Sequence, residues 1–122
     1  MPSIKLREDE NFIALLDIFP NTKGQAIVFP KKHYESNIAN LDNDIISNLM
    51  IASNKVINLL RKGLNVDRVG IIIEGMQVNH IHVRLYPFFG SIGFENGIDA
   101  GPKADVLELQ KLADEILHST NR

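Results

Sequence analysis

Apolar residues along the chain first follow the period of β-strands and later that of helices. Short runs of branched and aliphatic residues, separated by turn-forming residues, predict strands. The first three runs are closely spaced, which favours an antiparallel meander. The last two are joined by a short connection and are expected to be neighbours. The predicted strands cover residues 4–7, 12–19, 25–29, 69–74 and 78–86.

Helical spacing of apolar residues predicts one long helix after residue 42. Asp42 is the expected N-cap and Asp44 lies in the first turn, where acidic groups suit the positive end of the helix dipole. Gly63 is expected to leave the helix in the left-handed conformation. The apolar stripe consists of Ile45, Ile46, Leu49, Ala52, Ser53, Val56, Ile57 and Leu60.

A glycine-rich loop over residues 88–101 separates the strands from a terminal helix that Pro102 can start. Together these elements predict an α+β domain spanning residues 1–122. We expect an antiparallel sheet of about five strands, one long helix packed on it and a C-terminal helix. The terminal helix has a stripe formed by Val106, Leu109, Leu112, Ala113, Ile116 and Leu117.

Composition narrows the function classes. The 122 residues, 44% of them hydrophobic and 23% charged, are typical of one soluble domain. A formal net charge of −2 argues against bulk electrostatic binding of nucleic acid or anionic membrane. The absence of cysteine excludes disulfides, thiolate metal sites and a cysteine nucleophile. Neither a signal peptide nor a membrane-spanning run is recognisable, so we expect a cytoplasmic protein.

The chemistry-bearing residues lie in the predicted strand 78–86, where alternate side chains point to opposite faces. One face is apolar and suits a core: Ile81, Val83 and Leu85. The other face is a row of polar and titratable groups: His80, His82, Arg84 and Tyr86. We interpret this second face as the active or binding face.

The pair His80 and His82 admits three interpretations. Both rings can be structural groups satisfied by hydrogen bonds. They can bind a metal, although the only other histidines are His33 and His118 and Arg84 would repel a cation. They can also act on phosphate, where a neutral imidazole attacks phosphorus and a guanidinium binds phosphoryl oxygens. We favour phosphate chemistry, with no metal and no cofactor.

The segment Val78-Asn79-His80-Ile81-His82-Val83-Arg84 resembles the motif of the histidine-triad (HIT) family, His-φ-His-φ-His, with arginine at the third position. Two further segments are similar to the family's Leu-Asp-Ile-x-Pro and Pro-Gly-His-x-Leu-Val-Ile-Pro-Lys-x-His, namely residues 16–20 and 23–33. The resemblance covers about residues 4–90, and residues 91–122 form the C-terminal loop and helix. It implies a HIT-like fold.

The resemblance implies a hydrolase or nucleotidyl transferase that acts on a purine nucleoside phosphate ester, anhydride or phosphoramidate. His82 matches the nucleophile that forms a nucleotidyl-histidine, and His80 matches the residue that supports its geometry. Asp17 would accept hydrogen bonds from the ribose hydroxyls. The base pocket would be lined by Leu15, Leu16 and Ile18, with Leu6 as a further member, although each of these aliphatic residues could equally be core.

The chain departs from the family pattern at several positions. Arg84 is permanently charged and cannot act as a general acid near neutral pH. Gln25 stands where the family has histidine, and Ile73 stands where it has an asparagine or glutamine that contacts phosphate. Gln77 is then the side chain expected to contact phosphate. Binding is therefore better preserved than catalysis, and a non-catalytic nucleotide-binding module is the alternative. Glu74 is either an exposed strand end or a partner of Arg84.

The family resemblance also suggests a homodimer in which two sheets join and the long helices pack together. The apolar breadth of the long helix, to which Met50 and Ile51 add, is compatible with a second buried face.

Overall fold

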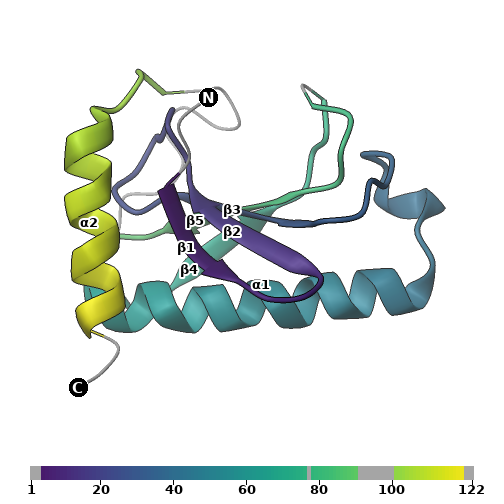
Figure 1. Ribbon diagram of the computed structural model, residues 1–122, viewed down its shortest axis with the longest axis horizontal. Coiled ribbons are helices and arrows are strands. Elements are labelled where there is room, and N and C mark those ends of the chain that lie inside the picture. The colour runs from purple at the N-terminus through teal and green to yellow at the C-terminus, as the bar shows by residue number, and fades with distance from the viewer. Residues whose placement is uncertain (1–3, 77, 91–100, 120–122) are drawn as a thin grey trace.

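A five-stranded antiparallel sheet is covered on one face by the long helix α1, while α2 lies across its end (Figure 1). The computed structural model of the chain describes residues 4–76, 78–90 and 101–119. The predicted α+β architecture is confirmed. Its elements are β1 (Ile4–Glu8), β2 (Phe12–Leu16), β3 (Ala26–Pro30), the 3-10 helix η1 (Ile38–Asn40), α1 (Asn43–Leu64), β4 (Val69–Ile72), β5 (Val83–Pro87) and α2 (Val106–Ser119).

The sheet has the strand order β1-β2-β3-β5-β4, and each neighbouring pair is antiparallel. The predicted meander of the first three strands is confirmed. The chain then crosses the sheet as α1, runs along the edge as β4 and returns between β3 and β4 as β5. This interior place explains why Val83, Leu85 and Tyr86 are almost fully buried.

The core lies between the sheet and the two helices. The buried positions of α1 are Leu49, Ala52, Ser53, Val56 and Leu60, which follow the predicted stripe. Ser53 satisfies its buried hydroxyl by donating to the carbonyl of Leu49 at 2.8 Å.

The end of α1 differs from the prediction. Gly63 stays inside the helix, and Asn65 takes the left-handed conformation at φ 55° instead. The helix is closed at Asn65, where the Arg61 carbonyl accepts the N–H groups of Asn65 and Val66. Glycine is needed at position 63 for packing, since a Cβ there would lie 2.6 Å from the Cα of Ile116 in α2. The predicted N-cap at Asp42 is confirmed by position, without a side-chain capping bond.

The terminal helix begins at Val106 and not at Pro102. Before it, the N–H groups of Gly101 and Ala104 donate to the carbonyls of Phe19 and Ile18. These two bonds tie residues 101–104 to the segment that follows β2. Asp105 then starts the helix, because its carboxylate accepts the N–H of Leu107 at 3.1 Å.

The strand predicted over residues 78–86 begins only at Val83. β3 ends at Pro30, which has no N–H to continue the ladder, and β4 ends at Ile72. The predicted extensions of β2 to residue 19 and of β4 to residue 74 are likewise absent. The backbone before Val83 pairs elsewhere, with the N–H of Ile81 donating to the Tyr34 carbonyl at 3.0 Å.

Arg84 lies on the sheet face opposite α1. Strand register places Leu15, Ile27, Arg84 and Ile72 side by side across β2, β3, β5 and β4. Their neighbours along the strands, such as Val28 and Val83, point into the core. An arginine thus stands in an otherwise aliphatic row. Within the described residues, no helix is long and apolar enough to cross a membrane.

Candidate active site

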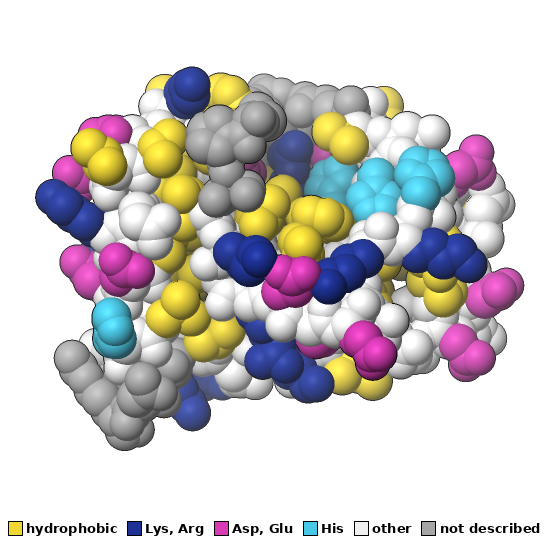
Figure 2. Space-filling model, viewed as in Figure 1, with side chains coloured by type: hydrophobic (Ala, Val, Ile, Leu, Met, Phe, Trp, Pro, Cys, Tyr) yellow, Lys and Arg dark blue, Asp and Glu magenta, His cyan; other side chains and the backbone are white. Residues whose placement is uncertain are grey.

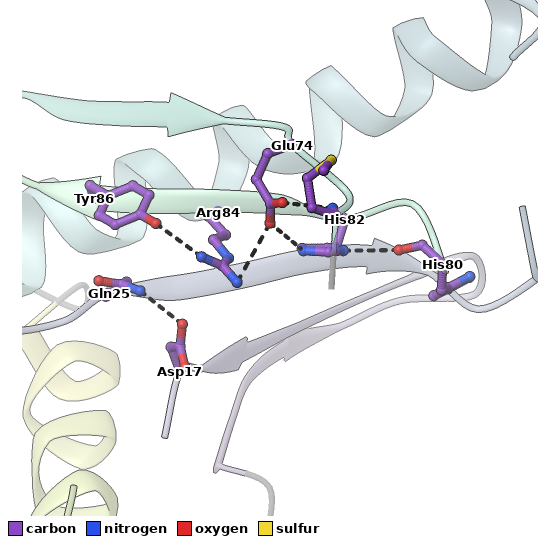
Figure 3. A network of polar contacts seen from close by, with 8 residues as sticks. Asp17, Gln25, Glu74, His80, His82, Arg84 and Tyr86 are labelled. Carbon is purple, nitrogen blue, oxygen red and sulfur yellow. Dashed lines mark hydrogen bonds and ion pairs between the residues drawn. The ribbon is translucent and has the colours of Figure 1, made fainter. Parts of the chain in front are cut away.

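Polar side chains from four parts of the chain meet on the open face of the sheet. Figure 3 shows Arg84 and Tyr86 on β5, His80 and His82 just before it, Glu74 after β4, and Asp17 with Gln25 beside β2 and β3. Figure 2 shows histidine side chains gathered on one face, next to a patch of hydrophobic side chains. The site is therefore a charged centre with an apolar border.

His82 is held in one tautomer by the backbone. Its Nδ1 lies 2.9 Å from the carbonyl oxygen of His80. A carbonyl only accepts, so in the neutral ring the proton is on Nδ1 and the lone pair is on Nε2. Only 8% of His82 is exposed. The Nε2 atom faces the charged centre, with the Oε1 atom of Glu74 3.8 Å away.

His80 has both ring nitrogens engaged. Nε2 lies 2.8 Å from the carbonyl oxygen of Pro30, and Nδ1 accepts the N–H of Tyr34 at 3.4 Å. The ring also packs edge-on against Phe29 and stacks on His33, with centroids 5.7 and 5.3 Å apart. His80 therefore anchors the segment before β5, and His82 alone of the two presents a lone pair to the site.

Arg84 lies among acceptors. Its NH1 donates to the hydroxyl of Tyr86 at 3.5 Å, and its NH2 lies 3.6 Å from Oε1 of Glu74. Burial alone would lower the pKa of Arg84, but the Tyr86 hydroxyl and the charges of Glu74 and Asp17 outweigh burial and raise that pKa. The guanidinium is thus a fixed positive charge beside the His82 ring.

Glu74 is the residue that the sequence left undecided. Only 11% of its side chain is exposed, so the prediction of an exposed strand end is wrong. The alternative prediction, that Glu74 pairs with Arg84, is confirmed. Oε2 accepts the N–H of Met76 at 2.6 Å, whereas Oε1 is buried without a hydrogen bond to any described residue. The sequence alone could not decide this, because it does not give the register that pairs Ile72 with Arg84 and so places Glu74, two residues further on, on the same face.

Asp17 and Gln25 form a second polar unit. Gln25 is 1% exposed; its Nε2 donates to Oδ2 of Asp17 at 2.8 Å, and its Oε1 accepts the N–H of Asn21 at 2.8 Å. The other carboxylate oxygen of Asp17 accepts the N–H of Phe19 at 2.9 Å. Gln25 thus holds the Asp17 carboxylate and is itself buried.

The predicted aliphatic residues separate into two groups. Leu16 and Leu6 are 2% and 5% exposed and belong to the core beneath the sheet. Leu15 and Ile18 are half-buried, and Leu15 lies in the same row as Arg84. Gln77 lies outside the described residues, as does residue range 91–100. His33 is exposed beside His80, and His118 is exposed in the last turn of α2.

Among the described residues, no group of three or more His, Cys, Asp or Glu side chains could hold a metal ion. What the centre offers is one nucleophilic nitrogen, one guanidinium and two carboxylates.

Comparison with known proteins identifies the family. Residues 1–88 match the HIT domain. An uncharacterized HIT-like protein of Borreliella burgdorferi is 32% identical over 121 residues, which cover 93% of this chain and 84% of that protein. A second uncharacterized HIT-like protein, from Methanocaldococcus jannaschii, is 33% identical over 97 residues, or 76% of this chain and 74% of the relative.

Solved structures show the same fold. A hypothetical histidine triad nucleotide-binding protein from Sulfolobus tokodaii superposes with a TM-score of 0.82 at 23% identity, covering 99% of this chain and 85% of that one. The family match spans the sheet, α1 and the segment that holds His80, His82 and Arg84. The chain therefore belongs to the HIT family, with arginine in place of the third histidine of the triad.

Proposed function

We propose that the chain binds a purine nucleoside phosphate on the open face of the sheet and transfers its nucleotidyl group through His82. The observation that carries this proposal is the contact between Nδ1 of His82 and the His80 carbonyl. It leaves the lone pair on Nε2, and Arg84 supplies a guanidinium beside that nitrogen. Family membership and the nucleotide-binding description of the Sulfolobus tokodaii protein agree with it.

The reaction has two balanced steps. The Nε2 lone pair of His82 forms a bond to the α-phosphorus, while the bond from phosphorus to the leaving atom breaks and that atom keeps the electron pair. Water or another acceptor then attacks phosphorus and gives up its proton to solvent, and the N–P pair returns to Nε2. A basic leaving atom takes up its proton from solvent, because Arg84 cannot supply it. Arg84 binds the phosphoryl oxygens and offsets their growing negative charge.

The remaining groups are assigned to binding. Asp17 keeps acceptor capacity on both oxygens beyond its bonds from Gln25 and Phe19, and it accepts the ribose hydroxyls. Leu15 and Ile18 offer half-buried aliphatic surface to the base. A nucleoside has a pair of ribose hydroxyls and a flat aromatic base whose faces pack on aliphatic side chains. Asp17 and the pair Leu15 and Ile18 therefore suit the two parts of one ligand.

The test is detection of the covalent intermediate. The wild-type protein is mixed with a reactive AMP or GMP donor, such as an imidazolide, and its intact mass is measured. The expected result is a mass increase of one nucleotidyl group in wild type and none in His82→Asn. Absence of any adduct across several donors and pH values would overturn the catalytic proposal.

A second candidate is a nucleotide-binding module without turnover. Glu74 favours it, because Oε1 lies 3.8 Å from the nitrogen that would attack, and Arg84 is no proton donor. Calorimetric titration with AMP and GMP, followed by product analysis, separates the two candidates. Binding without product favours the module, whereas absence of binding removes both.

We also propose a homodimer. Ile51 is 56% exposed on α1, and Ile71 is 38% exposed on β4, the edge strand of the sheet. Two chains that pair at this edge would cover both residues. Sedimentation at micromolar concentration should give twice the mass of the chain, and a monomer mass would refute the dimer.

A further inference from the structure

The charge of the centre is balanced by an acid that the family motif does not contain. Arg84 adds a positive charge at the third triad position. Glu74 lies 3.6 Å from its NH2 atom, and each of the two side chains is only 11% exposed. Together they form a nearly neutral pair beside His82.

The position of Glu74 is fixed by the turn that follows it. Oε2 accepts the N–H of Met76 at 2.6 Å, across a turn in which Gly75 has a φ of 63°. A side chain at Gly75 would meet the Oγ atom of Ser36 at 2.2 Å, so the turn is packed closely against the neighbouring loop. The carboxylate therefore cannot move far from the centre while this turn is kept.

The Oε1 atom of Glu74 is close to both His82 and Arg84. It is buried, it has no hydrogen bond to a described residue, and it lies within 3.8 Å of both Nε2 of His82 and NH2 of Arg84. Any phosphoryl group that reaches Nε2 must come close to this oxygen. At such short distances, in a partly desolvated site, the repulsion between like charges is large.

We propose that Glu74 determines the charge of the phosphoryl group that the site accepts, selecting a phosphoryl carrying one negative charge against one carrying two. This rests on the proposed function and deepens it. With Arg84 and Glu74 paired, one ligand charge can be offset by the guanidinium, while a second charge meets only the carboxylate. An esterified or amidated α-phosphate has one charge. The phosphate of a free nucleoside monophosphate has nearly two at pH 8, since its second pKa is about 6.

The consequence is a site that holds its substrate better than its monophosphate product. A phosphodiester or phosphoramidate enters with one charge, and hydrolysis creates a second charge beside Glu74. Glu74 thus acts on specificity and product release, and the attacking group remains His82.

The test compares two ligands that differ by one charge: AMP and the methyl ester of its phosphate, at pH 8. Calorimetry gives the ratio of their dissociation constants for each protein. Wild type should favour the ester, and Glu74→Gln should reduce that preference about tenfold. Glu74→Asp keeps the charge but withdraws it by about one methylene, so it should keep the direction of the preference at a reduced size. Glu10→Gln, which removes an exposed carboxylate from the β1–β2 turn, should leave it unchanged.

Arg84 provides an independent arm that does not depend on how Glu74→Gln folds. Arg84→Gln should increase the preference for the ester, and the double variant Glu74→Gln/Arg84→Gln should return toward the wild-type ratio. If the ratio of the two dissociation constants is the same in wild type, Glu74→Gln and Arg84→Gln, Glu74 does not select the ligand charge. That result would leave the proposed nucleotide site unaffected. If neither ligand binds any of these proteins, the proposed function itself is overturned, and this inference falls with it.

Discussion

The Nδ1 atom of His82 lies 2.9 Å from the main-chain carbonyl oxygen of His80. This contact decides which nitrogen of His82 carries the lone pair. The backbone therefore determines which ring atom can attack. The same segment is held from its other side, where the His80 ring contacts the Pro30 carbonyl. One histidine therefore fixes the backbone that orients the other.

His80→Ala should slow formation of the adduct without abolishing it. The carbonyl that contacts His82 remains, but the ring that anchors it to Pro30 and Tyr34 is lost. A small displacement of an attacking atom costs about 10- to 100-fold in rate. Single-turnover kinetics with a reactive AMP donor measures this. An unchanged rate would show that the His80 ring does not position His82.

Arg84→His should speed the reaction chiefly on substrates with poor leaving groups. Arginine cannot donate a proton near neutral pH, whereas histidine can, and general acid catalysis contributes about 100-fold or more. Turnover of an AMP phosphoramidate with an alkylamine should therefore rise. The matched control is a nitrophenyl ester of AMP, whose leaving group departs without a proton and whose turnover should change little. Equal changes on both substrates would contradict this role.

Gln25→Leu should reduce both the stability and the recognition of ribose. It removes the donor to Asp17 and the acceptor for Asn21, and loss of such bonds at a buried side chain costs about 1–3 kcal/mol in the free energy of unfolding. The preference for AMP over its 2′-deoxy analogue should fall, because Asp17 is no longer oriented. Urea unfolding and calorimetry measure the two effects.

The control is Gln110→Leu, which removes a similar Gln–Asp bond, to Asp114, on the exposed surface of α2. It should leave both quantities nearly unchanged. A loss of stability as large as that in Gln25→Leu would mean that burial is not the cause.

Gly63→Ala should destabilise the fold although alanine favours helices by about 1 kcal/mol. The added Cβ would lie 2.6 Å from the Cα of Ile116, so α2 would have to move. Overpacking of this kind costs about 1–3 kcal/mol in the free energy of unfolding. Ser47→Ala, at an exposed position of the same helix, is the control and should be neutral or slightly stabilising. A stabilised Gly63→Ala would show that the two helices do not pack closely here.

The sequence predicts the architecture well because its signals are local. Within the described residues, apolar periodicity located the five strands and the two α-helices, but not the 3-10 helix η1. The buried residues of α1 lie on the predicted stripe. The errors arise where distant segments compete for backbone groups. The predicted strand 78–86 loses its first half because Ile81 pairs with Tyr34, and the terminal helix starts late because residues 101 and 104 pair with Phe19 and Ile18.

The site is predictable only in part for the same reason. His82 and Arg84 stand out because they alternate with core residues along the chain. Glu74 stays undecided from the sequence because its place depends on the register between β4 and β5, which pairs Ile72 with Arg84 and which no local pattern reveals. Gln25 matches a position for which the family resemblance implies a ligand contact, but its side chain is 1% exposed and donates to Asp17.

The most direct test of the account is to locate the nucleotidyl group after reaction with a reactive AMP donor. Rapid quenching at neutral pH, proteolysis and fragmentation mass spectrometry assign the modified residue. We predict that the adduct is on His82, that His80 and the exposed His33 are unmodified, and that His82→Asn carries no adduct. Modification of His80 in place of His82, or an equal adduct in His82→Asn, would contradict the assignment of the attacking nitrogen.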